Sequence, residues 1–153
     1  MSILVVDDSE DGREIFSAVL AQGRYRDVVV VESAAAAFSY LALDSPSAVA
    51  MDVKLIFMDG AMPDIDGFQA CACIRSDPRY FDAPIVMVTA LDDIHSVDYA
   101  FECGATDYLT KPLKPVDLLA CTRAKLNLRA DIEQRNARER NLEQHEPFRF
   151  AFK

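Results

Sequence analysis

Short apolar runs alternate with stretches of helical periodicity five times along the chain. The runs are about four residues long, which suits strands that are buried on both faces of a sheet. Each is followed by polar or turn-forming residues that end it. We predict strands at Ile3–Val6, Val28–Val31, Leu55–Met58, Ile85–Val88 and Asp107–Thr110.

Residues at helical spacing separate these strands, and capping or breaking residues bound them. Gly23 marks the end of the first helix, and Ser33 is a candidate N-cap for the second. Strict alternation of strands and helices predicts an α/β fold with a five-stranded parallel sheet and helices on both faces, the doubly wound flavodoxin-like arrangement. We predict helices at Glu10–Gln22, Ser33 to about Leu43, Ile65–Arg75, about Asp92–Cys103 and from Pro115 onward.

The last helix is predicted to continue through Asn127 to about Glu143, because no Gly or Pro occurs before Pro147. We therefore divide the chain into a domain at residues 1–126 and a helical extension and tail at residues 127–153. A partial heptad seam runs along this helix, with charged residues between its apolar positions. The seam consists of Leu118, Cys121, Leu128, Ile132 and Leu142, interrupted by Lys125, Arg135 and Glu139.

Two interpretations of this extension stay open. It is either a solvated helical arm or a coiled-coil linker to an output domain. The tail after it has Phe at every second position, at Phe148, Phe150 and Phe152. That pattern fits a strand-like docking segment as well as a frayed end.

Composition and charge exclude several classes of function. Hydrophobic residues make up 51% of the chain and charged residues 27%, as in ordinary globular proteins. A net charge of −9 argues against nucleic-acid binding by this chain. The apolar runs are too short to cross a bilayer, and the start of the chain does not resemble a signal peptide, which predicts a cytoplasmic protein. The spacing of the four cysteines fits neither a zinc site nor a CxxC redox pair, which predicts reduced packing residues.

Polar residues stand at the carboxyl ends of four predicted strands, where parallel sheets bind their ligands. Clustered carboxylates repel one another unless a cation neutralises them, and oxygen-only ligands suit Mg²⁺. A carboxylate nucleophile beside Mg²⁺, an ammonium group and a hydroxyl is equipped to accept a phosphoryl group. The residues are Asp7, Asp8, Asp59, Thr89 and Lys111.

Each of these residues also has an ordinary structural interpretation. Asp8 or Ser9 could simply cap the following helix, and Lys-Pro pairs such as Lys111-Pro112 are common in loops. The joint occurrence of all these residues at four strand ends favours a site.

Four segments resemble the response regulator receiver domains of two-component signal transduction. They are Leu4–Asp8, Met58–Phe68, Val88–Ala90 and Gly104–Pro112, and the resemblance covers about residues 2–126. It implies a phosphorylatable signalling switch rather than an enzyme acting on other substrates. Its phosphoryl donor would be a histidine kinase or a histidine phosphotransfer protein.

The resemblance also implies roles for individual residues. Asp59 would accept the phosphoryl group, and Thr89 and Lys111 would contact its oxygens. Asp8 would bind Mg²⁺ directly and Asp7 through water, with Asp59 and the backbone carbonyl of Ala61 completing the protein ligands.

Further family features concern signal output. The aromatic side chain at Tyr108 would swing inward and change the face formed by the fourth helix, fifth strand and fifth helix. The bond between Lys111 and Pro112 is expected to be cis. The chain departs from the family at Lys54, where many members have Asp before the third strand, and we expect this to affect the surface alone. It also departs in the stretch Ser45–Val53, which is longer than usual.

We also expect a homodimer through the face of the fourth helix, fifth strand and fifth helix, continued by the helical arm. Many related transcription factors pair this face through an Arg bonded to the Asp before the aromatic switch. Here Cys121 stands at the Arg position, so that bond to Asp107 is not available.

Two other classes of protein were considered. An aspartate-nucleophile phosphohydrolase needs a second Asp two residues after the nucleophile, and Ala61 occupies that position. A flavodoxin-like cofactor binder would need a phosphate loop rich in Ser, Thr or Gly after the first strand, where this chain has Asp7–Asp11.

Overall fold

The computed structural model describes residues 2–90 and 94–145. Five parallel strands form one sheet in the order β2-β1-β3-β4-β5. The helices connect successive strands, and the last helix follows the last strand. The elements in chain order are β1 (Ser2–Val6), α1 (Glu10–Gln22), β2 (Val28–Val31), α2 (Ala34–Tyr40), β3 (Val53–Asp59), α3 (Gly67–Arg75), the 3₁₀ turn η1 (Pro78–Tyr80), β4 (Ile85–Thr89), α4 (Ile94–Glu102), β5 (Asp107–Thr110) and α5 (Pro115–His145).

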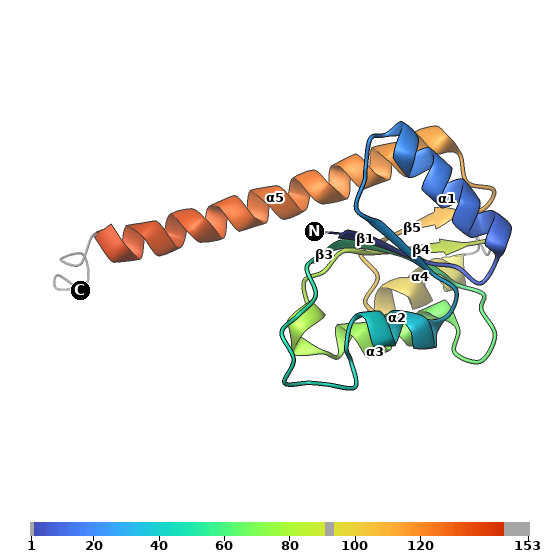
Figure 1. Ribbon diagram of the computed structural model, residues 1–153, viewed down its shortest axis with the longest axis horizontal. Helices are drawn as coiled ribbons and strands as arrows, with labels where there is room; N and C mark the ends of the chain where they lie inside the picture. Colours follow the sequence, from blue (N-terminus) through green and yellow to red (C-terminus); the bar gives the residue numbers. More distant parts are fainter. Residues whose placement is uncertain (1, 91–93, 146–153) are drawn as a thin grey trace.

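Helices cover both faces of the sheet, with α1 and α5 on one face and α2, α3 and α4 on the other (Figure 1). Each face has its own core. The core under α1 and α5 includes Phe16, Phe57 and Leu118, and the opposite core includes Met58, Ile74 and Tyr80. The predicted doubly wound α/β fold is confirmed.

Strand β3 lies in the middle of the sheet and pairs with β1 on one side and β4 on the other. It was predicted at Leu55–Met58 and is longer at both ends, because Val53 pairs with Ser2 and Asp59 pairs with Val88. The carboxyl ends of β1, β3 and β4 therefore lie side by side at one edge of the sheet.

Two helices are shorter than predicted. Helix α3 begins at Gly67 rather than Ile65, because the Asp66 side chain accepts a hydrogen bond from the Gln69 amide and acts as N-cap. Helix α2 ends at Tyr40 rather than near Leu43. Helix α4 is described from Ile94, and the first residues predicted for it, Asp92 and Asp93, lie outside the described residues.

The long stretch Ser45–Val53 is held in place by the 3₁₀ turn η1, which was not predicted. The Arg79 guanidinium donates hydrogen bonds to the carbonyl oxygens of Ala42, Ser45 and Ala48. The Tyr80 hydroxyl donates to the Leu41 carbonyl at 2.7 Å and accepts from the Met51 amide at 2.9 Å. These contacts satisfy backbone groups that lie outside helices and strands.

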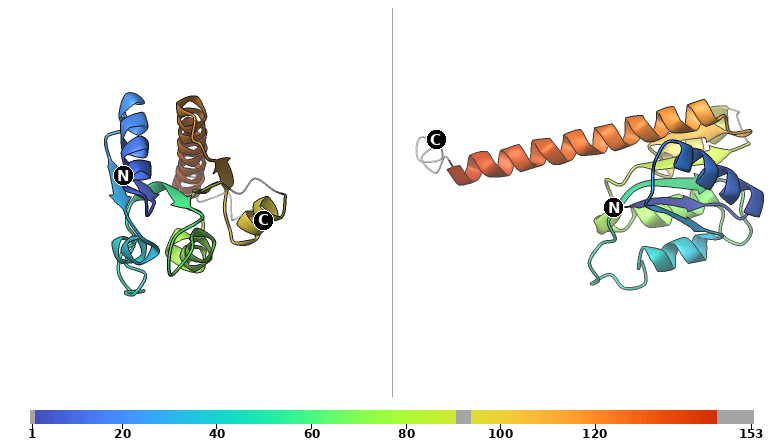
Figure 2. Two further views of the ribbon diagram at one scale, coloured as in Figure 1. Left: turned by 90° about the vertical axis from the view of Figure 1, so that its right-hand side faces the viewer. Right: turned by 45° about the horizontal axis from the view of Figure 1, so that its top comes forward.

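Helix α5 has 31 residues and extends well beyond the sheet (Figures 1 and 2). At 1.5 Å per residue it is about 46 Å long. Leu118, the first residue of the predicted heptad seam, is fully buried in the core of the domain. Leu128, further along, is 50% exposed. The side chains of Ile132 and Leu142 and the whole tail segment Phe148–Phe152 lie outside what the structure describes.

The four cysteines are free, as predicted. Cys71 is buried in the core, whereas Cys73 is exposed, so the packing role holds for Cys71 and is wrong for Cys73. In the described ranges, no helix combines the length and the apolar character needed to span a membrane.

Candidate functional site

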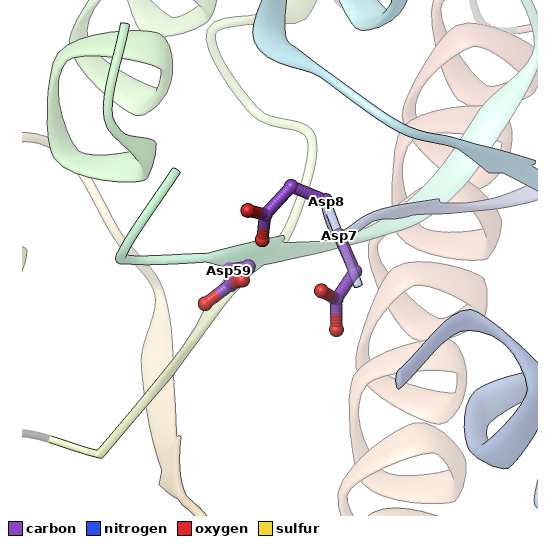
Figure 3. A group of neighbouring side chains, drawn as sticks. All are labelled: Asp7, Asp8 and Asp59. Carbon is purple, nitrogen blue, oxygen red and sulfur yellow. The ribbon is translucent and has the colours of Figure 1, made fainter. Parts of the chain in front are cut away.

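The sheet brings the predicted polar residues to one edge. Asp59 is the last residue of β3 and Thr89 the last of β4, and Asp7 and Asp8 follow directly after β1. Lys111 follows β5. Figure 3 shows the three carboxylates gathered where β1 and β3 end.

The three carboxylates are close enough to share a cation. Asp7, Asp8 and Asp59 each offer an oxygen, and these oxygens lie within 4.8 Å of one another. Asp7 is 1% exposed and Asp59 is 4% exposed, whereas Asp8 faces solvent. Like charges this close repel strongly, and burial of two of them removes the water that would screen the repulsion.

Asp7 is fixed by the start of helix α1. Its Oδ1 accepts a hydrogen bond from the Ser9 amide at 2.9 Å, and its backbone carbonyl accepts one from Arg13 Nη1 at 2.9 Å. Its Oδ2 is buried and has no hydrogen-bond partner among the described residues. A side chain at Gly12 would overlap this oxygen. Because buried polar atoms are nearly always paired, an oxygen in this position fits a cation ligand.

Two residues of α1 and its cap support Asp7, and only one of them was named from the sequence. Ser9 was one of two candidate N-caps, and the structure assigns it that role through a hydrogen bond from the Gly12 amide at 3.2 Å. Asp8 is thereby left for another function. The contact of Arg13 depends on how α1 is oriented over β1, which no local pattern in the sequence indicates.

Asp59 receives two contacts on a single oxygen. Its Oδ1 accepts hydrogen bonds from Lys111 Nζ at 3.2 Å and from the Ala61 amide at 3.3 Å. One ammonium group therefore faces a cluster of three carboxylates, which leaves the cluster net negative. The predicted cis bond between Lys111 and Pro112 is present.

The negative charge affects the ionisation of Asp59. Burial raises the pKa of Asp59 from its ordinary value of 3.8 to about 6, and the charge of Asp7 acts in the same direction. The ammonium of Lys111 opposes these effects and lowers the pKa. The carboxylate is therefore destabilised in the protein without a bound cation.

Backbone contacts hold Asp59 and Thr89 in place. The Lys111 amide donates to the Thr89 carbonyl at 2.9 Å, and the Gly60 amide donates to the Val88 carbonyl at 2.9 Å. Gly67 lies so close to β3 that a side chain there would overlap the carbonyl oxygen of Asp59. Thr89 is buried beside the backbone of Gly60.

The structure shows the positions of Ala61 and Tyr108, and the roles predicted for them stay predictions. The backbone carbonyl of Ala61 was predicted as a metal ligand, and the contact seen for Ala61 is made by its amide. Tyr108 lies in β5, partly buried against the core below α3 and α4. Its role as a switch remains a prediction. Asp107, beside it, forms an ion pair with Lys125 at 3.0 Å.

A cleft of about 290 Å³ adjoins the acidic cluster. It lies between the start of α1 and the segment after β5, and it is open to solvent at Ile15, which is 50% exposed. The lining residues are Asp7, Ser9, Asp11, Gly12, Ile15, Lys111, Pro112 and Leu113.

A doubly wound sheet with an acidic cluster and a lysine at its carboxyl edge defines a receiver domain. The sequence model of the family described as response regulator receiver domain matches residues 3–123, so the chain belongs to this family. Receiver domains are signalling switches of two-component systems.

Known proteins agree with this classification. The response regulator PleD of Caulobacter vibrioides is 34% identical over 141 residues, which are 90% of this chain and 28% of PleD. The chain thus spans less than a third of that relative.

Among solved structures, a putative response regulator from Chloroflexus aurantiacus matches with a TM-score of 0.72 and 30% identity, covering 82% of this chain and 97% of that one. The receiver domain of a sensor histidine kinase from Pseudomonas aeruginosa has a TM-score of 0.69 and 25% identity, with coverage of 82% and 97%. That structure has a magnesium ion coordinated in its active-site cleft.

The raised pKa of Asp59 predicts how stability depends on pH when a chelator removes divalent cations. Between pH 3.8 and about 6 the Asp59 carboxyl group is ionised in the unfolded chain but protonated in the folded protein. The free energy of unfolding therefore falls as pH rises through this window. The difference of about 2 between the two pKa values corresponds to at most about 3 kcal/mol. We expect Asp59→Asn to raise the free energy of unfolding at pH 8 by up to this amount and to change it little at pH 4.

Chemical denaturation at both pH values measures the effect. The exposed Asp8 provides a matched control, because Asp8→Asn removes a charge from the same cluster with little burial. Equal gains in the two variants, or a gain from Asp59→Asn at pH 4 as large as at pH 8, would contradict this account of the raised pKa.

Proposed function

We propose that the chain is a phosphorylatable signalling switch in which Asp59 accepts a phosphoryl group. The observation that carries this proposal is the buried Asp59 carboxylate, in contact with Lys111 and within 4.8 Å of oxygens from two further aspartates. A carboxylate that served only to stabilise the fold would gain little from burial and from the charge of Asp7, which both raise its pKa.

The residues present fit a magnesium ion. Asp7, Asp8 and Asp59 would hold it, and the unpartnered Oδ2 of Asp7 supports this assignment. We include the backbone carbonyl of Ala61 in the ligand set on the resemblance to the family. When bound, the ion would neutralise the carboxylates and offset negative charge on the transferring oxygens.

The chemistry follows from the residues of this chain. An oxygen of Asp59 forms a bond to the phosphorus atom of the donor, and the bond between phosphorus and the donor nitrogen breaks, with its electron pair going to the histidine ring. Lys111 supplies a positive charge to the phosphoryl oxygens, and the Thr89 hydroxyl supplies a neutral donor. Burial of Asp59 keeps bulk water away from the acyl phosphate.

The donor in this proposal is a histidine kinase or a histidine phosphotransfer protein in the cytoplasm. The cleft beside α1 offers the donor an approach to Asp7 and to Lys111, which contacts Asp59, and the exposed Ile15 is among its lining residues. The chain is then a substrate of its partner and acts on no other substrate itself. A phosphohydrolase function is less well supported, because the methyl side chain of Ala61 cannot serve as a general acid.

The output of the switch would pass through Tyr108. Its partly buried ring packs against the core on the side of α4, so rotation would alter the surface that β5 forms with α4. This surface carries apolar side chains. Tyr99 and Phe101 of α4 are 48% and 46% exposed, and Val116 of α5 is 77% exposed.

Phosphorylation by a small donor tests the assignment of Asp59. With acetyl phosphate and Mg²⁺, intact-mass measurement should show a single added phosphoryl group, because the donor needs only the acceptor site. Asp59→Asn should abolish the modification, and a chelator should prevent it in the unaltered chain. Asp66→Asn is a matched control, since Asp66 caps α3 and lies outside the acidic cluster. A phosphoryl group on the Asp59→Asn variant would overturn the assignment.

The same surface and the arm suggest a homodimer. Asp107 forms an ion pair with Lys125 of the same molecule. We therefore expect the arm to contribute more to dimer formation than Asp107 does. Leu128 is exposed on the arm and is available to a second copy. The association would be weak, because charged residues interrupt the seam.

Sedimentation velocity with and without beryllofluoride, a phosphoryl mimic, measures this association. We expect a dimer that strengthens with beryllofluoride and is lost when the chain is truncated after Gln134, which keeps the contacts of Arg129 and Glu133. A monomer at all concentrations in both states would exclude the dimer. A dimer unaffected by the truncation would exclude the arm from it.

A further inference from the structure

The first turns of the arm, beyond the domain boundary predicted at residue 126, are attached to the domain by ion pairs. Arg129 Nη1 lies 3.1 Å from Asp82 Oδ2 and also donates to the Asp82 carbonyl at 3.2 Å. One turn further, Glu133 Oε1 accepts a hydrogen bond from Lys54 Nζ at 2.7 Å. Both contacts join residues far apart in the sequence.

Arg129 and Glu133 also contact each other, with Nε and Oε1 3.2 Å apart. Asp82, Arg129, Glu133 and Lys54 therefore form a continuous chain of charges, which we call the arm clamp. Lys54 also lies 4.0 Å from Asp52. A network of this kind holds a helix more firmly than an isolated surface pair does.

Lys54 is the residue whose effect was expected to be limited to the surface, and that expectation is wrong. Its side chain is 17% exposed, so a large part of it is shielded from water while its ammonium binds Glu133. A hydrogen bond from Lys54 lowers the pKa of Glu133, which keeps the carboxylate ionised. Removal of Glu133 would leave a poorly hydrated ammonium group with only the more distant Asp52.

The arm clamp attaches α5 near the start of two of the four strands whose carboxyl ends form the candidate site. Lys54 is the second residue of β3, which ends at Asp59, and Asp82 precedes β4, which ends at Thr89. Helix α5 has neither Gly nor Pro between Val116 and His145, so the sequence provides no hinge between the domain and the arm.

We propose that the arm clamp makes the base of the arm part of the rigid receiver domain, so that the domain sets the direction in which the arm projects. A second copy or an output segment bound along the arm is then held in a fixed orientation to the sheet. This inference does not depend on phosphorylation of Asp59. It moves the boundary of the folded domain from residue 126 to at least Glu133.

Hydrogen exchange of the full chain, followed by mass spectrometry, tests the clamp through charge reversal. Glu133→Lys should speed exchange of the amides at residues 127–134 by about fivefold, the upper range for a surface ion pair. The charge-swapped double variant, Lys54→Glu with Glu133→Lys, should reverse part of this increase, because it restores the pair between positions 54 and 133 but not the pair between position 133 and Arg129. Glu and Lys have similar helix propensities, so the changes in exchange report the ion pairs.

Glu139→Lys is the matched control, because it makes the same substitution at an exposed position further along the helix. Peptides from β1 report whether the domain stays folded in each variant. If Lys54→Glu alone fails to fold, the comparison of Glu133→Lys with the swapped variant still tests the arm clamp. Faster exchange in Glu133→Lys that the swap reverses in part supports the clamp. Unchanged exchange in Glu133→Lys, an equal effect of Glu139→Lys, or no reversal by the swap overturns it.

Discussion

Repulsion among three aspartates at the carboxyl edge of the sheet is the constraint around which this domain is built. Asp7, Asp8 and Asp59 bring oxygens within 4.8 Å of one another, and Lys111 is the cation seen in contact with them among the described residues. Burial is the main cause of the raised pKa of Asp59, and the charge of Asp7 adds to it. A bound divalent cation would neutralise part of this charge, which is why the cluster fits a cation site.

The rest of the fold keeps these charges in place. Parallel strands joined by helices bring residues distant in sequence to one edge, and a buried sheet holds their backbones rigidly. Gly12 and Gly67 allow α1 and α3 to approach the aspartates more closely than any other residue would. At the opposite edge of the sheet, Lys54 at the start of β3 and Asp82 just before β4 form ion pairs with Glu133 and Arg129 of α5.

The sequence predicted the alternating fold and the meeting of these polar residues at one edge of the sheet, because strand ends are fixed by local patterns of apolar and polar residues. Helix ends were less certain, since the capping of α3 by Asp66 depends on one side-chain hydrogen bond. The arm clamp could not be predicted, because Lys54, Asp82 and Glu133 are ordinary charged residues until the fold brings them together. The same holds for Arg79, whose role in the stretch Ser45–Val53 depends on carbonyl groups more than 30 positions away.

The central claim is that the acidic cluster binds a divalent cation, and thermal unfolding at pH 8 with and without MgCl₂ tests it most directly. A ligand at 100 times its Kd stabilises the folded state by about 2.7 kcal/mol, so the midpoint should rise with Mg²⁺ concentration in the unaltered chain. NaCl at matched ionic strength controls for screening. We expect Asp8→Ala to lose this response while remaining folded, because Asp8 is exposed and would be a ligand of the ion. A midpoint that ignores Mg²⁺ in the unaltered chain, or one that rises equally in Asp8→Ala, would contradict it.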